Sequence, residues 1–310
     1  MTGRYDARLL ARAFPRYRDF DMIAQNEYGA VCRVWSILDG FPVALKVTQA
    51  MGNPLLEARF EREYELLQTT RHPRILQVFK DHGRVPVEMP EGSTLMHFFF
   101  TMELCSADVG RSLRRLSFGQ RLAVINQLFD GICFLHVSGI AHRDIKPINV
   151  FLRGDPEQSG INVKIGDFGI AKDARVGSML ATQGVLGTPG YLAPERLVPT
   201  DMNAASRAWF PSDQYALGVT VYEILSRGVS PFTFEAGLNY QKAEDLMKVH
   251  RDGSRRQLRV PDLPSRSIAN VENVLRKMMA PNVTERFRDV HRSYRALLHA
   301  CALDGITLAG

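Results

Sequence analysis

Two charged residues near the start of the chain occupy positions that favour an ion pair. Glu63 follows Phe60 by three residues and precedes Leu67 by four, so it lies on the apolar stripe of a predicted helix. A carboxylate buried without a partner is costly. Lys46 lies in a predicted strand, 41–47, whose alternation can turn it inward to meet Glu63 and position a polyphosphate. Taken alone, each charge favours a snorkelling or surface position; the motifs later in the chain favour the pair.

Four short motifs follow one another further along. Residues 142–149 read His-Arg-Asp-Ile-Lys-Pro-Ile-Asn and follow a predicted helix. Residues 167–169, Asp-Phe-Gly, follow an apolar strand. The runs Gly-Thr-Pro-Gly-Tyr at 187–191 and Ala-Pro-Glu at 193–195 come next. One three-residue match could arise by chance, but several in this order and context make chance negligible.

With these motifs the sequence resembles the eukaryotic-type (Hanks-type) Ser/Thr protein kinase family, from about 17 to 300. The resemblance implies an α+β, bilobal protein kinase fold. A small β-rich N-lobe with one key helix would span about 17–104, and a larger, mainly helical C-lobe about 105–300. Residues 1–16 would form a basic N-terminal segment and residues 301–310 a C-terminal tail.

The resemblance also implies the catalytic residues of a phosphoryl transfer from ATP. Phosphoryl transfer requires in-line positioning and neutralisation of the triphosphate charge. Asp144 would accept or orient the proton of the substrate hydroxyl, and Lys146 would neutralise the transferring group. Lys46 would contact the α- and β-phosphates and be held by Glu63. A lysine at 146, with the Gly-Thr-Pro segment at 187–189, is typical of the Ser/Thr subclass.

A metal site and a nucleotide pocket follow from the same resemblance. Asn149 and Asp167 would supply oxygen ligands for Mg²⁺, a hard cation. The implied ATP-binding residues are Gly29, Val31, Ala44, Lys46, Met102, Glu103, Cys105 and Phe151. Among them, hydrophobic side chains would enclose the adenine ring, and the backbone of Glu103 and Cys105 would pair with its edge.

The phosphate-covering loop departs most from the family pattern. The family has G-x-G-x-x-G-x-V, whereas residues 24–31 read Ala-Gln-Asn-Glu-Tyr-Gly-Ala-Val. Only Gly29 remains of the three glycines, which allow close backbone approach and positive φ. Asn26 tolerates positive φ better than most residues, but Ala24 does not replace glycine freely. We therefore expect altered ATP affinity or loop closure.

Other matches indicate support and regulation. We expect Glu195 to pair with Arg286, and Asp213 to hydrogen-bond the backbone near His142. Arg143 precedes Asp144, and in relatives with this arginine a phosphorylated activation loop often pairs with it. The loop at 172–186 contains two hydroxyl acceptors, and we expect autophosphorylation at Thr182 and, second, at Ser178.

The elements that must position these residues can be drafted from periodicity and capping signals. Ser117 and Gln120 form a capping box at the start of a helix that Gly139 ends. We read 82–95 as a long Pro- and Gly-containing loop. The expected strands are 29–35, 41–47, about 75–80 and about 96–104, and the expected helices are 55–70, 118–138, 213–226, 268–279 and 286–301.

Composition limits the remaining possibilities. The 310 residues are 45% hydrophobic with a net charge of +6, which suits one domain or two packed lobes and favours a solvated basic surface over nucleic-acid binding. Four cysteines without a C-x-x-C pair and no apolar run near ~20 residues favour a cytoplasmic protein without a membrane span. The arginines of 1–16 recur every four residues beside a short apolar face. This pattern predicts a short basic helix packed beside the domain in preference to a presequence or membrane-surface helix.

Three functions remain open from the sequence. The first is an active Ser/Thr protein kinase acting on protein substrates, with a possible regulatory partner or dimer. The second is a pseudokinase or scaffold with weak nucleotide binding, motivated by the degenerate glycine loop. The third is a small-molecule kinase, although such enzymes generally lack the segment 187–195 that builds a peptide-docking surface.

Overall fold

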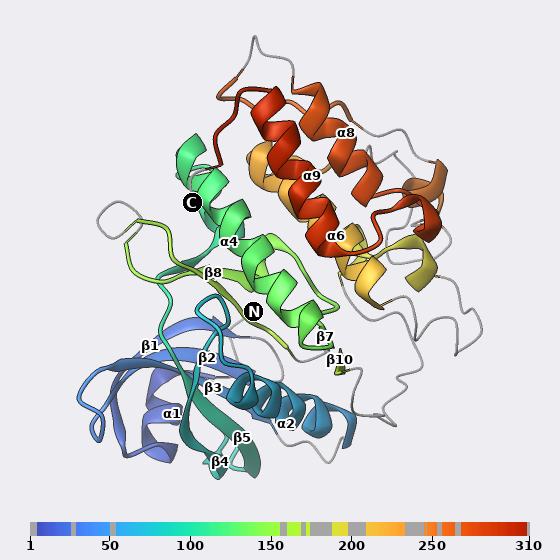
Figure 1. The fold of residues 1–310 in the computed structure, drawn as a ribbon. Coiled ribbons are helices and arrows are strands. Elements are labelled where there is room, and N and C mark those ends of the chain that lie inside the picture. The colour runs from blue at the N-terminus through green and yellow to red at the C-terminus, as the bar shows by residue number, and fades with distance from the viewer. Residues whose placement is uncertain are drawn as a thin grey trace. The chain divides into compact units, whose positions relative to one another are not determined.

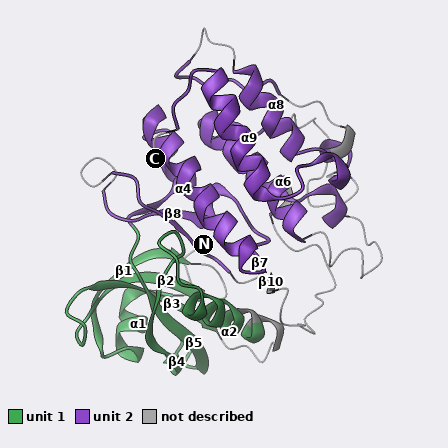
Figure 2. Ribbon diagram, in the orientation of Figure 1, with its two compact units in different colours: residues 1–105 green, residues 106–310 purple. Residues whose placement is uncertain are grey.

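The computed structural model divides into two compact units, residues 1–105 and residues 106–310 (Figure 2). Its α+β architecture has a β-rich first unit and a mainly helical second unit, as predicted. The structure describes residues 5–25, 29–49, 54–155, 160–168, 172–173, 188–197, 209–232, 245, 247–252, 256–263 and 268–308.

The first unit is built on a five-stranded antiparallel sheet in the order β1-β2-β3-β5-β4 (Figure 1). Its strands are β1 (Tyr17–Gln25), β2 (Gly29–Ser36), β3 (Pro42–Gln49), β4 (Val78–Glu88) and β5 (Thr94–Met102). The predicted hairpin is confirmed, because β2 pairs with β3 from Gly29↔Thr48 to Trp35↔Pro42. The predicted helix over 55–70 is α2 (Pro54–Thr69).

The loop predicted at 82–95 is wrong, because most of it is strand. β4 continues to Glu88, pairs with β5 from Val78↔Met102 to Glu88↔Thr94, and turns back within 89–93. Pro86 misled the prediction, since proline cannot donate to a strand ladder. It is tolerated here because β4 is an edge strand of the sheet.

A short helix, α1 (Ala7–Ala13), covers the face of the sheet opposite α2 (Figure 1). Asp6 caps it by accepting a hydrogen bond from the Leu9 backbone N–H at 2.7 Å. Leu10 is fully buried, and Phe14 packs edge-on against Phe99 of β5 at 5.0 Å between ring centroids. The predicted short basic helix beside the domain is therefore confirmed, and its apolar face forms part of the first unit's core.

The second unit is mainly helical. Its longer helices are α4 (Phe118–Val137), α6 (Trp209–Leu225), α8 (Ala269–Met278) and α9 (Val290–Leu303), and α3 (Val109–Ser112) is a single turn. Small strands complete it: β6 (Ala107–Asp108), β8 (Val150–Leu152) and β9 (Val163–Ile165) form one sheet, and β7 (Ile140–Ala141) pairs with β10 (Lys172–Asp173). The capping box predicted at Ser117 is present, with both reciprocal hydrogen bonds to Gln120.

The buried helix expected from 213 begins four residues earlier, at Trp209. Pro211 lies in its first turn, where a missing backbone N–H costs little. Within the part of the chain that the structure describes, we find no helix with the length and apolar character needed to cross a membrane.

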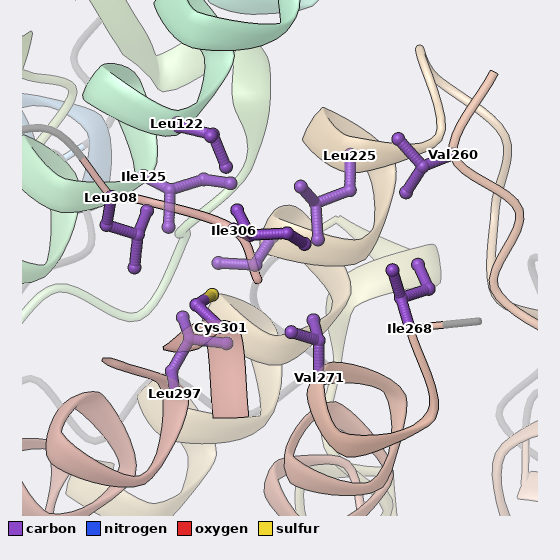
Figure 3. A pocket seen from close by; sticks show the side chains of 11 residues that line it. Leu122, Ile125, Leu225, Val260, Ile268, Val271, Leu297, Cys301, Ile306 and Leu308 are labelled. Carbon is purple, nitrogen blue, oxygen red and sulfur yellow. The ribbon is translucent and has the colours of Figure 1, made fainter. Parts of the chain in front are cut away.

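The helices of the second unit enclose an apolar interior that the C-terminal residues complete (Figure 3). Ile306 and Leu308 turn back over α4, α6 and α9, and the side chains leave a cavity of only about 10 Å³. The boundary expected at residue 300 falls inside α9, although the domain limits remain predictions. The lining residues are Leu122, Ile125, Val221, Leu225, Val260, Ile268, Val271, Leu297, Cys301, Ile306 and Leu308.

Candidate active site

The first unit contains the ion pair expected from the sequence. Lys46 Nζ lies 2.7 Å from Glu63 Oε1 and 2.6 Å from Oε2, so both carboxylate oxygens accept from the ammonium group. Glu63 is only 4% exposed, and Lys46 also lies over the Phe100 ring at 5.7 Å from its centroid. Burial explains the pairing, because an ionised carboxylate in a low-dielectric interior needs a compensating charge and hydrogen bonds.

Strand register gathers the residues expected around the adenine ring. Val31 of β2 faces Lys46 of β3, and Ala44 of β3 faces Met102 of β5. Residues directly opposite each other on neighbouring antiparallel strands share one face of a sheet. The residues of these three strands that are expected to bind the nucleotide therefore form one surface.

The segment after β5 is fixed by its own hydrogen bonds. The Glu103 backbone N–H donates to the Gln77 carbonyl at 2.9 Å, and Glu103 Oε1 accepts from the Gln77 N–H at 2.9 Å. Cys105, expected to face the adenine edge with its backbone, is half-buried and ends the first unit.

Gly29 is required for a reason other than phosphate approach. A Cβ atom there would lie 2.2 Å from the Val47 carbonyl oxygen of the neighbouring strand. The glycine thus permits close β2–β3 pairing at the base of the expected phosphate loop. Asn26 lies outside the described residues.

In the second unit, Asp213 of α6 holds the backbone of the 142–149 run. Its Oδ2 accepts from the His142 N–H at 2.7 Å, and its Oδ1 accepts from the Arg143 N–H at 2.7 Å. Arg143 has φ of 73°, a conformation that an L-residue adopts only when its surroundings impose it. This confirms the hydrogen bonding predicted for Asp213.

Asp144 is the centre of a compact polar network. Lys146 Nζ donates to Asp144 Oδ2 at 2.7 Å and to Thr188 Oγ1 at 2.5 Å, and the Thr188 hydroxyl donates to Asp144 Oδ1 at 3.1 Å. Asn149 Nδ2 donates to the Asp144 backbone carbonyl at 2.9 Å and to Oδ2 at 3.0 Å. A carboxylate, an ammonium group and a hydroxyl therefore converge within hydrogen-bond distance of one another.

The two expected metal ligands, Asn149 and Asp167, lie on backbone segments that a hydrogen bond joins. The Gly166 N–H donates to the Asn149 carbonyl at 3.1 Å, and Asp167 follows with φ of 64°. Because the Asn149 amide nitrogen is engaged with Asp144, its amide oxygen is the atom that could bind a metal. Among the described residues, no three His, Cys, Asp or Glu side chains gather as a metal site. One carboxylate and one amide oxygen fit Mg²⁺, which proteins typically hold together with substrate phosphates.

His142 links the 142–149 run to Gly166 and Phe168. The Asp144 N–H donates to His142 Nδ1 at 3.3 Å, so the ring proton is on Nε2, which donates to the Gly166 carbonyl at 3.0 Å. Its ring packs against Phe168 at 4.8 Å between centroids, and Phe168 is fully buried. Gly169 lies outside the described residues.

Two side-chain interactions hold the 188–197 segment: an ion pair of Glu195 with Arg286 and a hydrogen bond from Tyr191 to Glu223. Arg286 makes a bidentate ion pair with Glu195, at 2.7 Å for both contacts, which confirms the predicted pair. The Tyr191 hydroxyl donates to Glu223 Oε2 of α6 at 2.6 Å. Burial raises the pKa of the Glu223 carboxyl, although the Tyr191 hydrogen bond opposes that shift.

Some expected features cannot be compared with the structure, and one contact was missed. Thr182 and Ser178 lie outside the described residues. Phe151 is half-buried in β8, where it pairs with Lys164 of β9. The contact that the sequence did not predict is the stack of the Trp209 ring on Arg143. The only sign of it in the sequence is a tryptophan two residues before Pro211.

Comparison with known proteins confirms the predicted protein kinase fold. The family model described as the protein kinase domain matches residues 17–295, and the chain belongs to this family. It is 32% identical over 240 residues to the serine/threonine-protein kinase PknL of Mycobacterium bovis, covering 74% of this chain and 54% of that protein. It is 30% identical over 282 residues to the serine/threonine-protein kinase PknA of Mycobacterium tuberculosis, covering 88% and 58%.

A cyanobacterial relative gives a similar result. The chain is 32% identical over 234 residues to serine/threonine-protein kinase A of Synechocystis sp., covering 71% of this chain and 41% of that protein. The chain is thus homologous to bacterial Ser/Thr protein kinases. It spans about half the length of the curated relatives it matches.

Proposed function

We propose that this chain transfers the γ-phosphate of ATP to serine or threonine hydroxyl groups of a protein substrate. The observation that carries the proposal is the network around Asp144, in which Lys146 donates to both Asp144 and Thr188. A substrate hydroxyl that replaced Thr188 at Asp144 would have its proton accepted by the carboxylate. Its oxygen would bond to the γ-phosphorus of ATP as the bond from that phosphorus to the bridging oxygen breaks and ADP leaves. The adjacent Lys146 ammonium would neutralise the transferring group.

The remaining residues bind and orient the nucleotide in this proposal. Lys46, fixed by Glu63, binds the α- and β-phosphates, and the Val31, Ala44 and Met102 surface encloses the adenine. Asn149 and Asp167 would hold Mg²⁺, which would supply charge neutralisation for the triphosphate. The loop at 24–31, which departs from the glycine pattern of the family, is expected to alter ATP affinity.

A comparison of acceptors tests this function. Purified protein is incubated with γ-labelled ATP and Mg²⁺ together with generic protein acceptors or a small-molecule panel. We expect labelled protein whose acid hydrolysate contains phosphoserine or phosphothreonine, and no label in the Lys46→Met control. Label found only in small molecules would favour a small-molecule kinase. Nucleotide binding without any transfer would favour a pseudokinase.

Regulation forms a second part of the proposal. We expect autophosphorylation at Thr182 and, second, at Ser178, where a phosphate would add negative charge for Arg143. Mass spectrometry of active protein would detect these sites. Full activity with neither residue modified would contradict this part. A regulatory partner or dimer, and a cytoplasmic location, remain proposals beside it.

A further inference from the structure

The indole ring of Trp209, the first residue of α6, stacks on two arginines. The guanidinium carbon of Arg143 lies 3.7 Å from the ring centroid, and that of Arg196 lies 3.4 Å from it. Two guanidinium groups so close to one centroid would overlap on a single face, so they occupy opposite faces. Each cation therefore meets the negative face of the ring quadrupole.

α6 holds the catalytic run, residues 142–149, at two points: one is the hydrogen bonding of Asp213 and the other is this stack. Trp209 and Asp213 are four residues apart, so they lie on the same side of the helix. Asp213 accepts from the Arg143 backbone N–H, while Trp209 stacks on the Arg143 side chain. Arg143 directly precedes Asp144, so its side-chain and backbone positions bear on the reacting carboxylate.

The opposite face of the indole rests on a firmly held segment. Arg196 follows Glu195, which is fixed by the bidentate pair with Arg286. Burial lowers the pKa of Arg196 to about 10, opposed by the charges of Glu195 and Asp213. Its guanidinium thus remains protonated near neutral pH and retains its attraction to the ring.

We propose that Trp209 is a positioning residue of the active site, which holds Arg143 and thereby the catalytic run by cation–π stacking. The inference rests on the proposed kinase function and goes beyond it, by assigning a role to a residue outside the kinase motifs. Stacking occupies the face of the guanidinium and leaves its N–H edges directed sideways. Arg143 can therefore accept the stack and a loop phosphate together.

Matched substitutions separate positioning from bulk packing. Trp209→Leu keeps an apolar side chain without a π face, whereas Trp209→Phe keeps the face. We expect Trp209→Leu to lower kcat about tenfold, equivalent to about 1.4 kcal/mol, with KM for ATP within about twofold. Trp209→Phe should recover most of this loss. Trp35→Leu is the control, because Trp35 also lies near a cation, with Arg18 at 5.5 Å, but belongs to β2; its kcat should stay unchanged.

A double-variant comparison guards against a purely structural effect. In an Arg143→Met background, Trp209→Leu should lower kcat no further, because the stacked partner is already absent. An additive fall would overturn the proposal, as would an unchanged kcat in Trp209→Leu alone. Equal losses in the Phe and Leu variants would overturn it too, since they would indicate packing in place of stacking.

Fluorescence tests the stack even in a protein that transfers no phosphate. The chain has two tryptophans, so Trp209 is the sole indole in a Trp35→Phe background. We expect acrylamide to quench Trp209 more strongly after Arg143→Met, because one face of the ring loses its cover. Identical quenching with and without Arg143 would overturn the inference. Absence of phosphate transfer by the wild type would contradict the proposed kinase function. The quenching experiment would still decide whether Trp209 stacks on Arg143.

Discussion

At the scale of single residues, the proposed chemistry depends on charges placed where water is scarce. Glu63 is buried and binds Lys46 through both oxygens, and Asp144 is held by Lys146 and Asn149. Such groups are oriented before a substrate arrives, which is the main way that enzymes stabilise developing charge. The same burial makes each pair sensitive to the loss of one member.

The Lys46–Glu63 pair allows stability and activity to be separated. Lys46→Met removes the ammonium group from a buried carboxylate, and we expect the free energy of unfolding to fall by about 3 kcal/mol. Adding Glu63→Leu should restore most of that stability, because apolar groups then replace both charges. Phosphate transfer should stay absent in both variants. Urea denaturation measures the first effect, and a double variant as unstable as the single one would contradict the burial argument.

The cysteines provide a test of the nucleotide pocket. Burial raises the pKa of Cys32 and Cys133 to about 12 and that of Cys301 to about 11, so these thiols stay protonated and covered. Cys105 is half-buried at the expected adenine edge. We expect iodoacetamide at pH 8 to alkylate Cys105 first, and saturating ATP with Mg²⁺ to slow that reaction. Mass spectrometry identifies the site; an unchanged Cys105 rate with nucleotide would contradict its assignment to the pocket.

At the scale of elements, ion pairs tie helices to loops in the second unit. Asp262, in the segment 256–263, accepts from Arg121 of α4 and from Arg227 after α6, the latter at 2.6 Å. Arg121 is fully buried. Burial disfavours the Asp262 carboxylate, but the hydrogen bonds and charges of both arginines outweigh this effect and hold its pKa below the ordinary value of 3.8.

This arrangement predicts a defined pH dependence. Because the folded pKa of Asp262 is depressed, its stabilisation is present above pH 3.8 and is lost as pH falls through the folded pKa. At pH 7 we expect Asp262→Asn to lower the free energy of unfolding by about 3 kcal/mol. The difference from wild type should narrow in acid, as followed by denaturation at several pH values.

An exposed ion pair supplies the control for Asp262. Glu61 and Arg84 lie 3.2 Å apart with side chains that are 54% and 57% exposed. Glu61→Gln should change the free energy of unfolding by less than about 1 kcal/mol. Two results would contradict the stabilising role of Asp262 between Arg121 and Arg227. One is a similar loss in the free energy of unfolding from both substitutions, and the other is an Asp262→Asn loss that stays constant across pH.

At the scale of the whole molecule, local patterns and the family resemblance predicted several contacts, including the distant Glu195–Arg286 pair, but missed features that depend on the assembled fold. The ion pair of Lys46 with Glu63 was suggested by two periodicities and favoured by the later motifs, and the Ser117 cap followed from residue types three positions apart. The length of β4 was missed because Pro86 was read as a loop residue, whereas edge position is a property of the assembled sheet. The Trp209 stack depends on three segments that meet only in the folded unit. The chemical roles of the site residues stay predictions.

The most direct test of the central claim is phosphate transfer from γ-labelled ATP by wild-type protein and by Asp144→Asn. The wild type should label serine or threonine in itself and in a generic protein acceptor. The variant should bind ATP with similar affinity, because Asp144 is not among the residues proposed to enclose the adenine, yet transfer at least about a hundredfold more slowly, as expected for losing a general base. Equal transfer by both proteins, or no transfer by a folded wild type that binds ATP, would contradict the proposed catalytic role of this site.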